Sequence, residues 1–381
     1  MKLGELLLQI SYELQYSPED WARILNVSAD EVNGYFLGTK ELPVLPFFHL
    51  IHNSYSDYEK KKYIFSVHMD SIQSASNFLY AMELTEQSGE TESLIRIIEK
   101  AMKSEDPRVQ EWAEMYALSL KRDEMFEDDL LYTAKKATLK SSEMKILLET
   151  IRTQLLRKIN ANITIDKLAD EYSHHLEKIE NNFFKSAFKL RLHVSTIYST
   201  LRLNLVGKVR RIGEMYLNDE ETKVYFPLRH CYILHYYALS FLYEDPYRAL
   251  ELIDEANDIL KTIQNSRARH YLNENGKTKA FIKNVWEMDQ PEPDDIPEKI
   301  HYCIANGDMK KAQALLIDLE KVQPLTPFQD YYWGVAFSDE EALQRSYETF
   351  RSNGDFFFAV LPIRALSKMS LEKLKEKQIK N

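Results

Sequence analysis

Two pairs of neighbouring residues carry side chains that commonly bind metal ions or act as nucleophiles. His174 and His175 are adjacent, and Cys231 follows His230. Both pairs lie in stretches with helical apolar spacing, where consecutive side chains point in different directions. Because no further ligand follows at helical spacing, we expect packed or solvated side chains at both pairs and no metal site.

The motifs of the common enzyme classes do not occur in the sequence. It contains no GxGxxG or GxxxxGK(S/T) phosphate-binding loop, no GxSxG nucleophile turn and no HExxH metal-binding helix. We therefore expect no enzyme, no catalytic residue and no cofactor. The remaining candidates are residues that recognise another molecule.

Residues 17–43, SPEDWARILNVSADEVNGYFLGTKELP, contain the capping patterns of two short helices. Ser17 precedes a proline and an acidic first turn, and Ser28 lies three residues before a glutamate, which is the spacing of a capping box. The pattern predicts helices over residues 18–25 and 29–37, followed by a longer helix after a proline. The order A-x-x-L-x-V-S-x-x-x-V resembles the helix-turn-helix of the Cro/repressor type.

In such a helix pair, the second helix lies in the major groove with its N-terminal residues at base edges. The resulting candidates for contacts with bases and phosphates are Ser28, Ala29, Asp30, Asn33 and Lys40, with the Lys60, Lys61 and Lys62 cluster as further phosphate contacts. A solvated helix face is the alternative interpretation of the lysines.

The charge of this segment opposes strong DNA binding. Residues 1–50 contain three cationic and seven acidic residues, which gives 3 − 7 = −4, and the whole chain has a formal charge of −10. Since phosphate contacts supply much of the affinity for DNA, such a unit should bind weakly as a monomer. Either a homodimer doubles the contacts, which we favour, or the unit has become a protein-interaction element.

The remainder of the chain predicts an all-α fold. Ten glycines and twelve prolines in 381 residues favour long helices joined by short loops. We expect a helix-turn-helix domain over residues 1–54, a linker helix over 55–69, and a right-handed α-solenoid of degenerate tetratricopeptide-like repeats over 70–381. The segment YYWGVAFSDEEALQRSYETFRSNGD resembles one such repeat, in which Gly334 permits close helix approach. A stack of these pairs forms a groove suited to a peptide, or merely carries the first domain.

Composition also bears on the compartment. Cys231 and Cys303 are the two cysteines, each inside a helical stretch, and no segment approaches the length of apolar sequence that spans a bilayer. We therefore expect a cytoplasmic protein without disulfides and without membrane contact.

Four separated blocks carry a narrower resemblance: QSASNFLYAME, FIKNVW, HYCIANGDMKKAQALLIDLE and RSNGDFFFAVLPIRALSKM. The chain resembles the arbitrium peptide receptors (AimR type) of temperate Bacillus phages, within the peptide-sensing helix-turn-helix and tetratricopeptide regulators. The resemblance implies a homodimeric regulator that binds a double-stranded DNA operator and biases lysis against lysogeny. It also implies that a short signalling peptide, commonly a hexapeptide, binds in the repeat groove and reduces DNA engagement.

The positions that match the family's groove are Asn204, Arg229, Asp355 and Phe357, to which we add Arg202. What the resemblance implies is chemically sensible: Arg229 would hold the peptide carboxylate, and Asp355 would pair with a basic peptide residue. Asn204 would bind the peptide backbone and Phe357 would pack on it. The alternatives are a structural salt bridge for Arg229, a helix cap for Asp355 and a core position for Phe357.

Two further features bear on this reading. Between Glu180 and Glu214 there are seven cationic residues and no acidic one, and this basic run could supply positive potential to the groove, to DNA or to solvent. The family's C-terminal helix is commonly apolar, whereas here its apolar residues are Leu371, Leu374 and Ile379 on a charged helix. A host-type quorum-sensing regulator and a protein-sequestration module remain alternatives.

Overall fold

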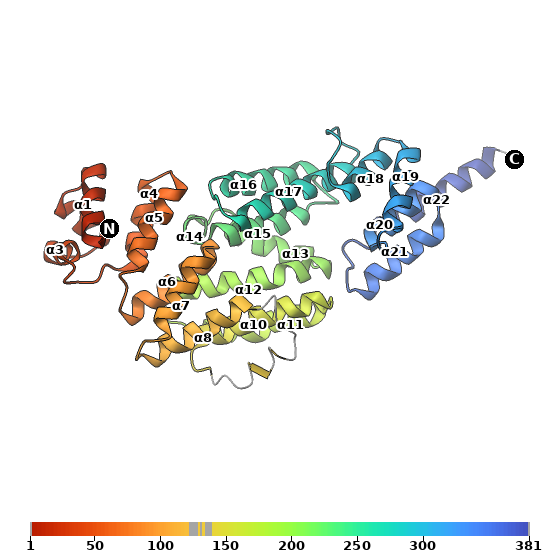
Figure 1. The fold of residues 1–381 in the computed structure, drawn as a ribbon. Helices are drawn as coiled ribbons and strands as arrows, with labels where there is room; N and C mark the ends of the chain where they lie inside the picture. The colour runs from red at the N-terminus through yellow and green to blue at the C-terminus, as the bar shows by residue number, and fades with distance from the viewer. Residues whose placement is uncertain (1, 122–128, 130–131, 134–138, 380–381) are drawn as a thin grey trace.

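The computed structural model describes residues 2–121, 129, 132–133 and 139–379, and the regular elements in these ranges are all helices. The helices form an elongated arch that runs from the N-terminal cluster to the long C-terminal helix (Figure 1). They are α1 (Leu3–Leu14), α2 (Pro18–Leu25), α3 (Ala29–Leu37), α4 (Val44–Ser54), α5 (Tyr58–Met69), α6 (Ala75–Ser88), α7 (Thr91–Ala101), α8 (Pro107–Lys121), α10 (Ser142–Lys158), α11 (Asn162–Leu176), α12 (Asn182–Arg202), α13 (Val206–Leu217), α14 (Glu220–Tyr225), α15 (Pro227–Leu239), α16 (Pro246–Lys261), α17 (Ser266–Val285), α18 (Ile296–Ala305), α19 (Met309–Glu320), α20 (Pro327–Phe337), α21 (Glu340–Ser352) and α22 (Val360–Ile379).

The first five helices share one apolar core. Trp21 on α2, Val32 on α3 and Phe47 on α4 are almost completely buried there, and Trp21 stacks on Phe47 with ring centroids 6.4 Å apart. Ile64 on α5 belongs to the same core. The predicted linker helix is therefore packed into the N-terminal unit, because its apolar face faces α1 and α4.

The two helices predicted to form a helix-turn-helix are α2 and α3, and their bounds agree with the predicted ranges. Ser17 accepts a hydrogen bond from the backbone N–H of Asp20, and Ser28 accepts one from that of Glu31. Both acidic side chains bond back to the cap residue, so each helix begins with a complete capping box. Asn26 takes a left-handed conformation with φ of 55° and ends α2, which turns the chain into α3.

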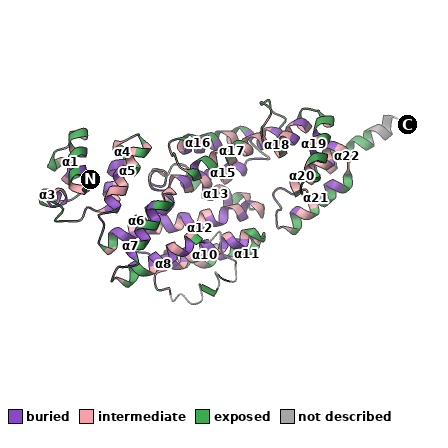
Figure 2. Ribbon diagram, viewed as in Figure 1, coloured by how far each residue is buried: buried purple, intermediate pink, exposed green. Residues whose placement is uncertain are grey.

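From α6 onward, sequential helices pack on one another and form a solenoid. One large core extends from α6 through α17 and also includes buried residues of α4, α5, α21 and α22, and a second smaller core, centred on Cys303, Leu316 and Tyr332, holds α18–α20 together. Buried residues follow the faces on which neighbouring helices meet (Figure 2). Gly334 lies where α20 meets α21, and a Cβ there would lie 2.5 Å from Cγ of Leu343. The predicted close helix approach at this glycine is confirmed.

The N-terminal unit is joined to the array by hydrogen bonds at the start of α6. The carboxylate of Glu41 accepts bonds from the backbone N–H groups of Gln73 and Ser74, each at 2.8 Å. Asn77 on α6 donates to the Leu42 carbonyl and accepts from the Val44 backbone N–H, both at 3.0 Å. The loop between α3 and α4 is thus tied to the first helix of the solenoid.

The structure also describes the residues behind the predictions on disulfides, metal sites, membrane contact and the C-terminal helix. Cys231 and Cys303 are both buried free thiols. No cluster of three histidine, cysteine or acidic side chains suited to a metal ion occurs in the described part of the chain. In that same part, no helix is long and apolar enough to cross a membrane. On α22, Leu371 is exposed, and the side chains of Leu374 and Ile379 lie outside the described set.

Candidate functional site

One face of α3 is exposed and carries the predicted DNA contacts. Ser28, Ala29, Asp30 and Asn33 are all exposed, whereas Val32 points into the core of the N-terminal unit. Ser28 caps α3 with its hydroxyl oxygen, and the first turn of the helix is accessible from solvent because Ser28, Ala29 and Asp30 are exposed. This arrangement can present Asn33 and the backbone of the first turn to another molecule.

Three of the four lysines predicted to contact phosphates already have acidic neighbours. Lys40 lies 3.9 Å from Glu31, Lys60 lies 2.7 Å from Glu13, and Lys62 lies 3.0 Å from Glu90. Hydrogen bonds from Lys60, Tyr55 and Gln9 lower the pKa of Glu13 to about 2, so this acid stays ionised beside Lys60. DNA phosphates would therefore have to compete with these carboxylates for the lysine side chains. In the folded chain, acidic residues thus lie directly beside the predicted phosphate contacts.

A buried ionic cluster joins α6, α12 and α15. Arg191 on α12 donates to both carboxylate oxygens of Glu83, from Nε at 2.9 Å and from Nη2 at 2.8 Å. Glu86, one turn further along α6, accepts from Nη2 of Arg191 and from Nη2 of Arg229, each at 2.8 Å. Tyr116 donates to Glu83. Glu83, Glu86 and Arg191 are almost completely buried and the Arg229 side chain is 17% exposed, so water screens these ion pairs only weakly.

The geometry of this cluster shifts the pKa values of Arg191, Arg229 and Tyr116. Burial alone would lower the pKa of Arg191, but the adjacent Glu83 and Glu86 carboxylates raise it above its usual value. For Arg229 burial prevails and lowers the pKa, with Glu86 opposing that effect. Burial, reinforced by Glu83, raises the pKa of Tyr116, which stays a neutral hydrogen-bond donor.

Arg229 retains hydrogen-bonding capacity beside this cluster. Its Nε–H is buried and has no partner, and the same holds for Nε–H of Arg157. Both residues and Arg191 line a small hollow of about 20 Å³, which is the size of one water molecule. A larger anion would reach this hollow only if the surrounding side chains moved apart.

A second cluster joins the end of α12 to the turn before α22. The Arg202 guanidinium pairs with the buried Asp355 carboxylate and lies 4.8 Å from the ring centroid of Phe358. The backbone N–H of Phe357 donates to the Arg202 carbonyl at 3.1 Å, and Tyr243 donates to the Phe357 carbonyl at 3.2 Å. Asp355 also caps the following turn by accepting from the Phe358 backbone N–H at 3.2 Å.

The structure thus brings together three of the five predicted peptide contacts: Arg202, Asp355 and Phe357. Asn204 follows Arg202 on an exposed turn, where it takes a left-handed conformation with φ of 60°. Arg229 belongs to the other ionic cluster. In the form described by the structure, Asp355 and Phe357 are buried, and a peptide would have to displace their present partners.

The sequence model of a family described as AimR transcriptional regulator-like matches residues 57–368. The chain belongs to this AimR-like family. The matched residues begin just before α5 and include the helical array, whereas the helix-turn-helix lies outside them. The family is one of transcription regulators, and the sequence likewise contains none of the enzyme motifs considered above.

Individual proteins similar to this AimR-like chain include an uncharacterized protein of Bacillus anthracis. It is 26% identical over 246 residues, which are 64% of this chain and 91% of that protein. The selenomethionine form of phAimR superposes with a TM-score of 0.75 at 18% identity, covering 97% of each chain. A phAimR structure with its ligand gives a TM-score of 0.71 at 19% identity, covering 87% of this chain and 98% of that one. These two structures show that the fold is that of AimR.

Sequence reasoning missed the acidic half of the buried cluster. Glu83 is the last residue of the block QSASNFLYAME, and Glu86 follows it three residues later on the same face of α6. Two carboxylates on one face among apolar neighbours require cationic partners, and that pattern could have indicated a buried ion-pair network.

The basic run between residues 180 and 214 is largely neutralised in this member of the AimR-like family. Partners come from distant helices: Lys208 pairs with Asp166 at 2.9 Å, and Arg210 pairs with Glu244 at 2.8 Å. Lys185, Arg191 and Arg202 are paired as well. Because these partners lie outside the run, the potential inferred from the linear sequence is much reduced in the folded chain.

Proposed function

We propose that the protein is a peptide-responsive, DNA-binding transcription regulator that controls lysis and lysogeny of a temperate Bacillus phage. It acts in the cytoplasm of the bacterial host, as a homodimer on a double-stranded DNA operator. The observation that carries this proposal is the accessible first turn of α3, which is presented by a packed unit in a chain of the AimR-like regulator family.

Binding of DNA would rest on uncharged contacts. Asn33 can donate to and accept from a base edge, and the N-terminus of α3 can bind a phosphate through its backbone N–H groups. Lys40 now lies 3.9 Å from Glu31. It can supply a cation to a phosphate when it separates from that carboxylate. A dimer would present two such faces, which compensates for the acidic character of each.

The signalling peptide would bind where the array carries spare polar groups. Arg229 has an unpartnered Nε–H and would take the peptide carboxylate. A basic peptide residue would replace Arg202 as the partner of Asp355, while Asn204 would bind the peptide backbone and Phe357 would pack on it. This exchange would loosen the contact between the end of α12 and the turn before α22.

Peptide and DNA would influence one another through the arrangement of the arch. The hydrogen bonds of Glu41 and Asn77 tie the helix-turn-helix to α6, and α6 also carries Glu86, the partner of Arg229. A peptide that changes the position of Arg229 can therefore bias the position of the N-terminal unit. By linkage, DNA would bias peptide affinity by the same factor.

The test is binding of the purified chain to DNA fragments of its own locus, measured by fluorescence anisotropy at low salt. The titration is repeated with the short peptide encoded just downstream and with a scrambled peptide as control. We expect binding that the cognate peptide alone weakens. Absence of DNA binding in both states, with the peptide still bound, would contradict the proposal.

A second candidate function is a protein-interaction module that sequesters a partner. The observation in its favour is the acidic N-terminal unit, in which Lys40 and Lys60 already have carboxylate neighbours. A pull-down from host lysate with the full chain, compared with a variant that carries Asn33→Ala, distinguishes the two. A partner whose capture ignores Asn33 while DNA binding is absent would favour this candidate.

A further inference from the structure

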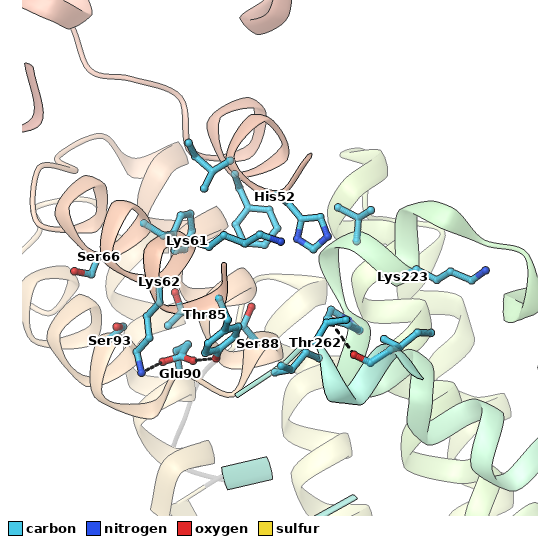
Figure 3. A pocket seen from close by; sticks show the side chains of 18 of the residues that line it. His52, Lys61, Lys62, Ser66, Thr85, Ser88, Glu90, Ser93, Lys223 and Thr262 are labelled. Carbon is cyan, nitrogen blue, oxygen red and sulfur yellow. Dashed lines mark hydrogen bonds and ion pairs between the residues drawn. The ribbon is translucent and has the colours of Figure 1, made fainter. Parts of the chain in front are cut away.

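A cavity of about 530 Å³ lies between the N-terminal unit and the helical array. One wall comes from α4 and α5, and the opposite wall comes from α14 and α16, with α6 and the start of α7 beside it (Figure 3). Its volume falls within the range of small-molecule sites. None of the five predicted peptide contacts lines it, so the inference goes beyond the proposed function.

The walls of the cavity are mainly apolar. Phe48 and Phe65 meet edge to face with ring centroids 5.0 Å apart, and Ile259 and Ile263 line the side formed by α16 and its following turn. Val224 and Pro227 complete this surface. Such a lining would gain free energy from an apolar molecule that displaces water from it.

The acidic residues of the lining all have cationic neighbours. Glu90 lies 3.0 Å from Lys62, Glu220 lies 2.9 Å from Lys223, and Asp258 lies 2.8 Å from Lys261. Glu255 lies 3.9 Å from Lys223 as well. These groups thus form pairs that leave no lining carboxylate without a cation.

Lys61 differs from these residues. It makes no ion pair or hydrogen bond within the described part of the chain, it is partly buried, and its ammonium group points toward the imidazole of His52 (Figure 3). Burial lowers the pKa of Lys61, and burial together with the Lys61 charge lowers the pKa of His52 to about 4. The wall therefore combines a cation without a counter-ion and a neutral imidazole.

A third polar group on the lining lacks a partner. Thr85 on α6 is 1% exposed, and its hydroxyl makes no hydrogen bond. A buried hydroxyl without a partner costs free energy, and a ligand with a polar atom would satisfy it. The cavity therefore suits a ligand that has an apolar part for the walls and an anionic group for the ammonium of Lys61.

We propose that this cavity binds a small molecule that has an apolar body and one carboxylate, with Lys61 and His52 holding the carboxylate. The apolar body lies between Phe65 and Ile259, so the ligand contacts both the N-terminal unit and the array. A straight-chain fatty acid and the apolar C-terminus of a short peptide share this chemistry.

The test is isothermal titration calorimetry of the full chain with octanoate and, in parallel, with octanol, which lacks the charge. We expect octanoate to bind more tightly than octanol. The Lys61→Met variant should lower octanoate affinity about tenfold or more, which is the effect of losing one charge-assisted hydrogen bond, and should leave octanol affinity unchanged. Lys61→Arg should retain octanoate binding.

Lys60→Met is the matched control. Lys60 lies on the same helix, pairs with Glu13 and does not line the cavity, so its loss should change octanoate affinity less than about twofold. Equal octanoate affinity of Lys61→Met and the unaltered chain would overturn the proposal. The comparison of octanoate with octanol on the unaltered chain does not depend on any variant, and equal affinities there would overturn it as well.

A further pair of probes identifies the source of the carboxylate. Acetyl-leucyl-leucine with a free carboxylate is compared with its C-terminal amide and with octanoate. Binding of octanoate alone supports a fatty acid, and binding of the dipeptide acid but not its amide supports a peptide C-terminus. If neither carboxylate binds, the proposal is wrong, and the test of DNA and signalling peptide is unaffected by that result.

Discussion

Arg229 is a residue whose two possible roles make different demands. As a structural partner it neutralises Glu86, whereas as a peptide contact it offers its unpartnered Nε–H. We expect Arg229→Ala to weaken peptide binding about tenfold or more, because a charge-assisted hydrogen bond is lost. Glu86 keeps Arg191 as a partner, so the chain should stay folded.

The measurement is calorimetric titration with the signalling peptide, accompanied by circular dichroism. Arg211→Ala is the control, because Arg211 lies in the basic run between Glu180 and Glu214, is not among the predicted peptide contacts and makes no ion pair in the described residues. Unchanged peptide affinity of Arg229→Ala would remove the residue from the site.

Asp355 is buried with Arg202, and its replacement should affect the fold as well as the peptide. Asp355→Ala leaves the Arg202 guanidinium without its partner and removes the cap on the Phe358 backbone N–H. We expect the free energy of unfolding to fall by about 2–3 kcal/mol, since Arg202 retains some access to water. Urea denaturation of both chains measures this. A loss below about 0.5 kcal/mol would show that the pair contributes little, as exposed pairs do.

At the scale of elements, α3 should be the helix that reads DNA. Asn33→Ala should lower DNA affinity because an exposed amide that can bond two base atoms is lost. Asp30→Asn should raise DNA affinity, because asparagine keeps a polar side chain at this predicted contact and removes an exposed charge that repels phosphates. Fluorescence anisotropy at two salt concentrations measures both. If neither change alters the DNA isotherm, α3 does not lie in the groove.

The packing of α20 on α21 predicts a contrast between two glycines. A Cβ at position 334 would lie 2.5 Å from Cγ of Leu343 and 3.0 Å from the Asp339 carbonyl oxygen, so Gly334→Ala should destabilise the chain by about 1–3 kcal/mol. Gly276 lies inside α17 with no atom within 4 Å of such a Cβ. Gly276→Ala should therefore stabilise by about 0.5–1 kcal/mol. Thermal unfolding of both variants decides, and shifts of the same sign would contradict the contrast.

Across the whole molecule, contacts between residues close in the sequence could be predicted, whereas contacts between distant residues could not. The bounds of α2 and α3 could be predicted because Ser17 and Ser28 cap helices through contacts three residues away. The solenoid could be predicted from helix period and breaks. The Arg202–Asp355 pair joins residues 153 positions apart, and Arg191 meets Glu83 across 108 positions. Contacts of this kind depend on how the array curves, which local pattern does not encode.

The site shows the same division. The exposed face of α3 was predictable, since capping and apolar spacing fix which side of a short helix is buried. The pairing of the basic run was not, because Asp166 and Glu244 reach it from other helices. The cavity beside Lys61 was also beyond reach of the sequence. Its walls belong to two units whose relative position depends on the Glu41 and Asn77 contacts.

The stability of the whole chain should depend on pH through its buried histidines. His68 and His230 are both 0% exposed, and burial lowers the pKa of each to about 4, with a hydrogen bond to the Leu42 carbonyl opposing this for His68. An unfolded chain binds protons at these histidines near pH 6.5, so it takes up more protons than the folded chain between about pH 6.5 and pH 4. Their contribution to stability is therefore complete above pH 6.5 and is lost as the pH falls.

Through this proton uptake, His68 and His230 should each lower the free energy of unfolding by about 2 kcal/mol between pH 7 and pH 5. The measurement is urea denaturation at pH 7 and pH 5, for the unaltered chain and for His230→Leu. Both ring nitrogens of His230 lack a hydrogen-bond partner, so leucine should be tolerated at pH 7. The variant should lose less stability than the unaltered chain on acidification, and because both share the same carboxylates, other titrations cancel in the comparison. Equal losses in the two chains would show that the buried imidazole of His230 does not contribute to acid sensitivity.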